Sequence, residues 1–138
     1  QLLDALVSRL YLWTSNRSEA LRFTHTTTLA DALRALTARL PAHCLTVVRD
    51  GAQGCWLSDS HGQQHIPGFK VQALDSNGAG DAHTGVLIAA LAAGHDAVQA
   101  ATRANAAAAL AVTRRGPATA ANSSEVDALV GKNGRGKR

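Results

Sequence analysis

The stretch DSNGAGDAHTG, residues 75–85, places two aspartates around a turn of Gly78, Ala79 and Gly80, and a long apolar run follows directly. A glycine turn that leads into a helix exposes backbone N–H groups at the positive end of the helix dipole, which favours anions. The glycines also let the backbone approach a charged group where side chains would intrude. The stretch therefore predicts a turn into a helix, and this turn either binds an anion or is only a tight connection.

The residues around the turn exclude two familiar phosphate-binding motifs. A P-loop requires Gly-Lys-Ser/Thr after its glycines, where Asp81 stands here, and a dinucleotide fingerprint requires a third glycine at the position of His83. The Asp81 carboxylate would also repel a phosphate bound by the same amides. A phosphotransferase has a use for this residue, because Asp81 can take the proton of an acceptor hydroxyl while the N–H groups stabilise the transferred phosphoryl group.

The segments on both sides of the turn alternate between helical and strand patterns. Helices are expected over residues 1–8, from about Ser18, and over 28–40, 82–93, 97–112 and 125–130. Strands are expected over residues 9–14 and 44–48, and a hairpin-like ribbon over 55–66. The two Ala-rich helices are apolar on nearly all sides, so they must be buried as in an α/β core. The expected fold class is α/β in one domain, without a repeat or linker.

Composition favours a cytoplasmic globular protein with no membrane partner. The chain has 138 residues, 46% of them hydrophobic and 17% charged, which is an ordinary balance for one compact domain. Its apolar runs are shorter than the roughly 20 residues of a membrane span. Cys44 and Cys55 lie in apolar, strand-like surroundings without the paired spacing of zinc ligands, so they are expected to be reduced, buried thiols.

The positive charge of the chain lies at its C-terminal end. The formal net charge is +4, and Lys132, Arg135, Lys137 and Arg138 all fall in the last seven residues. A frayed, solvated tail over 131–138 explains them better than a nucleic-acid-binding arm. The two Phe, one Tyr and two Trp do not interleave with a basic patch, so no nucleic acid is expected as a partner. The chain starts at Gln1 and contains no Met, which suggests a piece of a larger polypeptide.

Four stretches together resemble one protein family. DSNGAGDAHTG resembles the C-terminal signature of the ribokinase-like (PfkB) carbohydrate and nucleoside kinases, which is usually D-T-x-G-A-G-D followed by a small residue and an aromatic one. NRSE at 16–19 is similar to the family's N-x-x-E motif, and VVRDGAQG at 47–54 to its strand and G-x-x-G nucleotide loop. ANAAAALAVTRRGPA at 104–118 resembles its nucleotide-side helix and the loop after it. These matches follow the family's order and cover nearly the whole chain.

The resemblance implies a fold and a reaction. The fold would be the ribokinase-like three-layer α/β/α core, with residues 1–138 forming its C-terminal, ATP-side portion. The reaction would be transfer of the ATP γ-phosphoryl group to a hydroxyl of a sugar or nucleoside. Asp81 would be the catalytic base, and Gly78, Ala79 and Gly80 would form the anion hole.

The resemblance also assigns residues to the cofactors. Asn16 and Glu19 would act in the network of Mg²⁺ and phosphate, with Glu19 holding the metal through water. Gly51 and Gly54 would border the ATP, and Asn105 would lie near the adenine. In family members activated by a monovalent cation such as K⁺, the binding loops correspond to five positions: Asp75, Asn77, Ala111, Arg114 and Gly116.

Several of these residues also have a purely structural interpretation. Asn16 and Glu19 have the spacing of a helix N-cap and its capping-box partner. Asp75 is equally well an ordinary turn residue. His83, which replaces the usual aromatic residue, either contacts the acceptor or packs at the start of the helix, and packing is favoured. The other five histidines are expected on the surface: His25, His43, His61, His65 and His95.

The family's N-terminal part has no counterpart in this chain. That part supplies the sugar-contacting residues and a β lid, through which the full-length parent would form a homodimer. The competing hypothesis is therefore a non-catalytic, nucleotide-binding fragment that lacks the acceptor-binding half. The acceptor itself cannot be identified from these residues.

Overall fold

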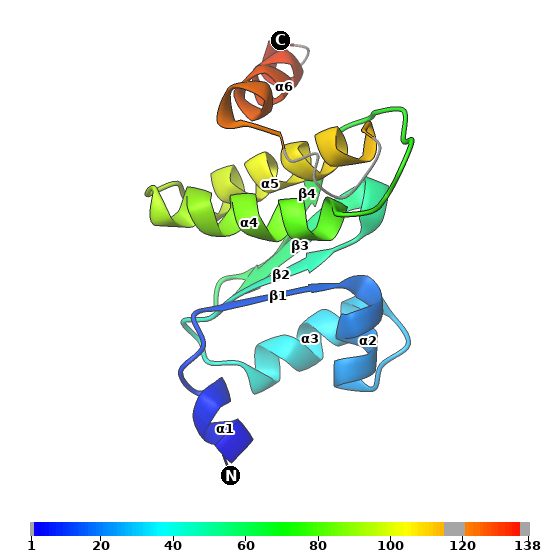
Figure 1. The fold of residues 1–138 in the computed structure, drawn as a ribbon. Helices are drawn as coiled ribbons and strands as arrows, with labels where there is room; N and C mark the ends of the chain where they lie inside the picture. The colour runs from blue at the N-terminus through cyan, green and yellow to red at the C-terminus, as the bar shows by residue number, and fades with distance from the viewer. Residues whose placement is uncertain (1, 115–120, 136–138) are drawn as a thin grey trace. The chain divides into compact units, whose positions relative to one another are not determined.

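A computed structural model describes residues 2–114 and 121–135. It divides the chain into two compact units. Unit 1 comprises Gln1–Gly51 and Cys55–His65, and unit 2 comprises Ala52–Gly54 and Ile66–Arg138. Figure 1 shows the order of the elements along the chain.

Unit 1 is built on a four-stranded sheet with the strand order β1-β2-β3-β4. Its strands are β1 (Leu12–Asn16), β2 (Leu45–Arg49), β3 (Gly54–Asp59) and β4 (Gly62–Pro67). β1 and β2 are parallel, with Asn16 opposite Arg49 at their carboxyl ends, and β2 and β3 are antiparallel. The ends of β3 and β4, at Gly54 and at Ile66 and Pro67, fall within unit 2.

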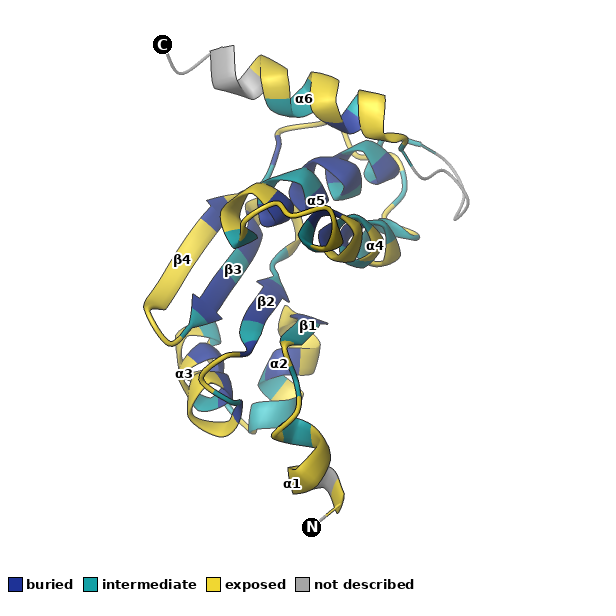
Figure 2. Cartoon of the chain, turned by 90° about the vertical axis from the view of Figure 1, so that its left-hand side faces the viewer, coloured by how far each residue is buried: buried dark blue, intermediate teal, exposed yellow. Residues whose placement is uncertain are grey.

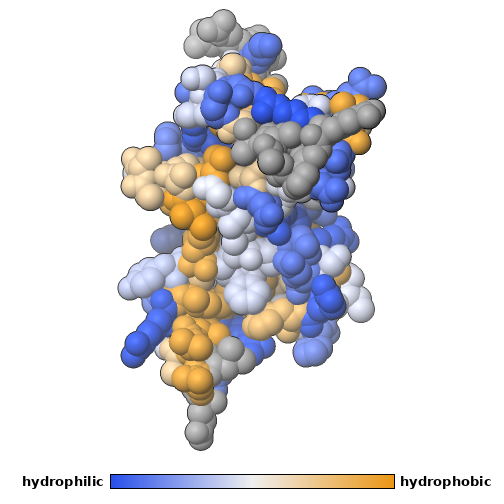
Figure 3. All heavy atoms as spheres, in the orientation of Figure 1, coloured by the Kyte–Doolittle hydropathy of each residue, from blue (hydrophilic) through white to orange (hydrophobic). Residues whose placement is uncertain are grey.

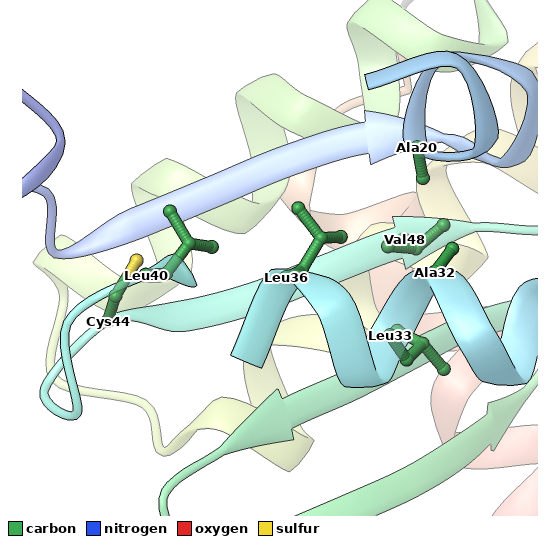
Figure 4. Packing of buried hydrophobic residues seen from close by; sticks show 7 residues of the cluster. All are labelled: Ala20, Ala32, Leu33, Leu36, Leu40, Cys44 and Val48. Atoms are coloured by element: carbon green, nitrogen blue, oxygen red, sulfur yellow. The ribbon is translucent and has the colours of Figure 1, made fainter. Parts of the chain in front are cut away.

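Three helices belong to unit 1: α1 (Leu2–Val7), α2 (Arg17–Thr24) and α3 (Leu29–Arg39). α2 and α3 connect the parallel strands β1 and β2 and lie together on one face of the sheet (Figure 1). α3 directs Ala32, Leu33 and Leu36 inward at helical spacing, into a buried cluster that includes Val48 of β2 (Figure 4). This apolar stripe is what the sequence pattern over 28–40 predicts.

The side chain of Thr28 caps the beginning of α3. Its hydroxyl oxygen accepts a hydrogen bond from the Asp31 N–H at 3.2 Å, and the hydroxyl donates to the Asp31 carboxylate at 2.9 Å. Arg34 pairs with the same carboxylate. The hydrogen bond from Thr28, followed by the contact with Arg34, lowers the pKa of Asp31 below its ordinary value. The first turn of α3 is therefore stabilised when Asp31 is ionised.

Thr28→Ala is expected to lower the free energy of unfolding by about 1 kcal/mol, because it removes the cap. It should also raise the pKa of Asp31 towards its ordinary value. The pKa of Asp31 is lower in the folded state than in the unfolded state. The ionised Asp31 carboxylate therefore stabilises the fold at neutral pH, and this stabilisation is lost as the pH falls through the folded pKa. Urea denaturation at two pH values and NMR titration of Asp31 measure both effects. Thr27→Ala, an exposed neighbour, is the control, and equal losses in the two variants would contradict the cap.

Unit 2 consists mainly of three helices: α4 (Ala79–Ala92), α5 (Ala97–Val112) and α6 (Ser123–Arg135). α4 packs along α5, and α6 also contacts α5. Small side chains allow this close packing, and most alanines of α5 are buried (Figure 2). Val126 of α6 joins a cluster with Phe69 and three alanines of α5: Ala106, Ala107 and Ala109. A short 3₁₀ turn (η1, Gly51–Gln53) precedes β3.

The α/β class is confirmed, and α5 has the bounds that the sequence predicts. α4 begins at Ala79 instead of 82, and β1 occupies Leu12–Asn16 instead of 9–14. The last helix extends beyond 125–130 at both ends, and it begins at Ser123 because Asn122 caps it by accepting from the Glu125 N–H at 2.9 Å. α6 includes residues 131–135, which the sequence analysis assigns to the tail, and 136–138 lie outside the described residues.

The expected surface and buried positions are largely confirmed. The five histidines expected on the surface are exposed, and Cys44 and Cys55 are buried free thiols. Burial raises the pKa of the Cys44 thiol. Figure 3 shows apolar side chains gathered over α1, where Leu2 and Leu6 are exposed. Across the described parts of the chain, none of the helices combines the length and the apolar character that crossing a membrane requires.

Candidate active site

The turn at residues 78–80 leads directly into α4. Gly78 precedes the helix with φ = 78°, a left-handed conformation that glycine adopts without strain. In the described structure no side chain caps this helix, and the Ala79 N–H donates to the Ser76 carbonyl at 3.3 Å. Asp81 is the third residue of α4, and its side chain lies in an exposed position. The turn thus presents a carboxylate to solvent within the first helical turn, where the dipole favours negative charge.

Asp75 shapes the loop before this turn. Its carboxylate accepts a hydrogen bond from the Asn77 N–H at 2.9 Å, which is the geometry of an Asx turn. The backbone N–H groups of Leu74 and Asp75 donate to the Val112 carbonyl at 2.6 and 3.1 Å. The loop is therefore tied to the C-terminal end of α5, close in sequence to Ala111. The turn interpretation of Asp75 is supported.

The expected cation site is only partly described. The bonds to Val112 bring Asp75 and Asn77 to the end of α5, next to two other predicted positions, Ala111 and Arg114. Gly116, the fifth position, lies outside the described residues. A K⁺ site here stays a prediction.

His83 and Asn105 form a buried polar pair between α4 and α5. The two residues are 2% and 4% exposed, and His83 Nε2 lies 2.9 Å from Asn105 Oδ1. Asn105 Nδ2 donates to the carbonyls of Ile66 and Pro67 at 3.0 and 3.1 Å. The interpretation of His83 as a packing residue is supported. A contact between the Asn105 amide and an adenine would require these bonds to break.

Asn16 and Glu19 begin α2 as a complete capping box in unit 1. The Glu19 N–H donates to Asn16 Oδ1 at 2.8 Å, and the Asn16 N–H donates to Glu19 Oε2 at 2.9 Å. The structural interpretation is therefore confirmed. A role of Glu19 in binding Mg²⁺ stays open, because a carboxylate offers about four acceptor positions and the capping box uses one of them. The Glu19 side chain is 50% exposed, so its carboxylate fits a role in holding Mg²⁺ through water.

Two ion pairs surround this box at the carboxyl ends of β1 and β2. Arg17 lies 3.4 Å from Asp50, and Arg49 lies 4.0 Å from Glu19. The motifs in the sequence do not predict these ion pairs. The signal that would reveal them is the charge order, since opposite charges follow two parallel strands whose ends are neighbours. In open α/β sheets this edge is where ligands bind.

The two glycines of the expected nucleotide loop differ in their surroundings. Gly51 is exposed with φ = 56°, and none of the described atoms would contact a Cβ placed there. Gly54 is buried with φ = 99°, and a Cβ would lie 2.1 Å from the Ile66 carbonyl oxygen and 2.5 Å from the Gly68 nitrogen. Gly51 is therefore accessible to a ligand, whereas Gly54 permits a close approach of two backbone segments.

The predicted residues fall into two groups. Unit 2 contains the turn at 78–80, Asp81, Asp75, Asn105 and Gly54, whereas Asn16, Glu19 and Gly51 belong to unit 1. Within the described ranges, no cluster of three or more His, Cys, Asp or Glu side chains could hold a metal ion. A metal bound near Glu19 would therefore need water or a substrate for most of its ligands, which is typical of Mg²⁺.

Comparisons with known proteins give consistent matches. The family described as pfkB family carbohydrate kinase matches residues 1–125. A fructokinase from Vibrio alginolyticus is 35% identical over 111 residues, which are 76% of this chain and 36% of that protein.

Solved structures agree with the sequence matches. A candidate ribokinase II from Escherichia coli, in complex with ATP and Mg²⁺, superposes with a TM-score of 0.83 at 28% identity and covers 94% of this chain. Fructokinase from Vibrio cholerae, with fructose, ADP and calcium bound, superposes with a TM-score of 0.79 at 29% identity and covers 87%. The chain spans 42% and 41% of these two proteins. The ribokinase-like fold is thereby confirmed.

Proposed function

The chain belongs to the pfkB family of carbohydrate kinases, and on this premise we propose that it forms the ATP-side part of a kinase for a sugar or nucleoside hydroxyl. The observation that carries this proposal is the exposed Asp81 in the first turn of α4, directly after the left-handed Gly78. The relatives act in the same chemical class: the matched proteins include fructokinases and an aminoimidazole riboside kinase.

Asp81 is proposed to act as the general base. Its carboxylate takes the proton of the acceptor hydroxyl as that oxygen forms a bond to the γ-phosphorus. The bond from the γ-phosphorus to the bridging oxygen then breaks, and ADP leaves with the electron pair. The turn of Gly78, Ala79 and Gly80 is proposed to supply backbone N–H groups that stabilise negative charge on the phosphoryl group, and the Ala79 N–H would have to leave the Ser76 carbonyl to do so. When bound, Mg²⁺ supplies further charge neutralisation on the phosphates.

Glu19 and the glycine loop are proposed to serve the nucleotide side. Glu19 would hold Mg²⁺ through water, with Asn16 fixing the carboxylate through the capping box. Gly51 leaves open space beside the backbone for ATP. The ATP and Mg²⁺ complex of the E. coli relative supports both cofactors. K⁺ near Asp75 is a further proposal, supported by a related fructokinase structure with potassium bound.

Glu19→Gln separates the two roles of this residue. Glutamine also completes a capping box, so the free energy of unfolding should stay within about 0.5 kcal/mol of the parent. The loss of the carboxylate should raise the Mg²⁺ concentration for half-maximal phosphoryl transfer by about 10–100-fold. Titration of activity with Mg²⁺ and urea denaturation measure these quantities.

Ser18→Gln is a suitable control, because it changes an exposed side chain next to Glu19 in the same helix turn. An unchanged Mg²⁺ requirement in Glu19→Gln would leave Glu19 with its capping role alone. A loss of stability in that variant would show that the charge contributes to folding.

The proposed activity is tested with the complete gene product that carries this sequence. Phosphoryl transfer from ATP should be measured over a panel of ribose, fructose, aminoimidazole riboside and other nucleosides. Transfer to at least one hydroxyl acceptor is expected. ATP hydrolysis without transfer to any acceptor would contradict the proposal.

The second candidate is a nucleotide-binding chain without catalysis. Calorimetry with ATP and Mg²⁺ on the chain as given shows whether these residues alone bind the nucleotide. Assembly as a homodimer and a cytoplasmic location are further proposals for the whole protein. The two buried free thiols support a reducing compartment.

A further inference from the structure

The apolar pattern of α4 does not by itself determine which face is buried. The buried stripe consists of His83, Leu87 and Ala90. A rotation of about 100° about the helix axis, which is one residue, would bury Thr84, Ile88 and Leu91 instead. Ile88 is 51% exposed in the observed orientation, so the alternative stripe is at least as apolar. The hydrophobic effect therefore discriminates weakly between the two orientations.

The buried polar pair makes that choice specific. His83 Nε2 meets Asn105 Oδ1 at 2.9 Å, and Asn105 is itself fixed by its bonds to the Ile66 and Pro67 carbonyls. Carbonyl oxygens only accept, so the Asn105 nitrogen must face them and its oxygen must face His83. His83 therefore donates from a protonated Nε2. In the alternative orientation this donor would leave its acceptor, and Asn105 Oδ1 would lose a buried bond.

The orientation of α4 decides where Asp81 points. Two residues along a helix correspond to a turn of about 200°, so burying His83 directs Asp81 to the opposite, exposed side. The observed exposure of Asp81 agrees with this geometry. A buried polar residue that fixes helix register is an established device in packed helices.

We propose that His83 is a positioning residue whose hydrogen bond to Asn105 fixes the rotation of α4 and thereby aims Asp81 and the turn at 78–80. The catalytic consequence rests on the phosphoryl transfer proposed above. The pair itself is a property of the fold and is tested independently of activity.

The first test compares variants in the complete gene product. His83→Leu removes the donor but keeps an apolar side chain, and it should lower kcat for phosphoryl transfer by about 10–100-fold, since small misplacement of a catalytic group is costly. The KM for ATP should change less than kcat. His83→Gln retains an N–H donor and should recover kcat to within a few-fold of the parent.

Leu87→Ala is the matched control, because Leu87 lies one turn further along the same buried stripe. The cavity should lower Tm more than His83→Leu does, yet leave kcat within about threefold at a temperature well below Tm. Equal losses of kcat in Leu87→Ala and His83→Leu would overturn the proposal, because general destabilisation would then explain both.

The second test uses NMR and does not depend on activity. Long-range ¹H–¹⁵N spectra of the unmodified protein should show His83 protonated at Nε2, and a ring protonated at Nδ1 alone would overturn the assignment. The amide signals of residues 78–81 should shift in His83→Leu. In His83→Gln they should lie closer to their positions in the parent protein. Unchanged signals in His83→Leu would also overturn it. Absence of transfer by the parent protein would refute the proposed function, while these spectra still decide the role of His83.

Discussion

Asp81→Asn is expected to reduce phosphoryl transfer by about 10²–10⁴-fold, the usual contribution of a general base. Asparagine has nearly the same shape but cannot accept the hydroxyl proton as the oxygen attacks. Because Asp81 is exposed at the first turn of α4, the substitution should perturb the fold little. Loss of the favourable interaction between the carboxylate and the helix dipole should lower the free energy of unfolding by about 0.3–1 kcal/mol. Steady-state kinetics on the complete gene product and urea denaturation measure the two effects.

Binding of ATP should survive this substitution, since Asp81 is not among the residues proposed to hold the nucleotide. The substitution removes a negative charge beside the proposed phosphoryl position, so the Kd for ATP measured by calorimetry should stay equal or fall. Asp4→Asn, which changes an exposed aspartate in the first turn of α1, is the control for a general effect of lost charge. Turnover of Asp81→Asn near that of the parent would refute Asp81 as the base.

The element boundaries that the sequence predicts well carry local signals. α5 starts after Asp96, which accepts from the Gln99 N–H at 2.8 Å, and Gly94 with φ = 95° ends the preceding helical segment. β1 is different, because Ser15 and Asn16 are typical of turns and helix caps, so the sequence pattern ends the strand at residue 14 instead of 16. Its position is set by parallel pairing with β2, which lies more than 25 residues away in sequence. Strand propensity depends strongly on such tertiary context.

The candidate site shows the same division between local and long-range information. The turn at 78–80, Asp81 and the capping box of Asn16 and Glu19 are readable because each is a short local motif. The role of His83 cannot be read from the sequence in this way, because it depends on a hydrogen bond with Asn105, 22 positions further along the chain. An adenine contact and a structural bond are chemically equivalent uses of an asparagine amide, and only the packing reveals which bonds are made.

Gly54→Ala is expected to cause the largest loss of stability among the variants considered. The Cβ would lie 2.1 Å from the Ile66 carbonyl oxygen and 2.7 Å from the Pro67 carbonyl carbon, both of which are backbone atoms. The φ of 99° adds strain for any residue with a side chain. Strain and overpacking each contribute about 1–3 kcal/mol, so the free energy of unfolding should fall by about 2–6 kcal/mol. Urea or thermal denaturation measures this change.

Gly62→Ala separates the clash from the strain. Gly62 also has a positive φ, 133°, but a Cβ there would meet no described atom within 4 Å. This variant should therefore lose only the part due to backbone strain, about 1–3 kcal/mol. If both variants lose equal stability, the close approach at Gly54 contributes nothing.

The comparison also decides between two interpretations of the glycine loop. If Gly54 serves to border ATP, Gly54→Ala should weaken ATP binding in a protein that remains folded. The structure favours the other result, because Gly68 makes the reciprocal approach: its Cβ would lie 2.3 Å from the Ala52 carbonyl oxygen. Gly54 and Gly68 thus cross at the two ends of the hairpin that contains β3 and β4. Loss of folding in both Gly54→Ala and Gly68→Ala would assign Gly54 to the fold and leave Gly51 as the glycine open to the nucleotide.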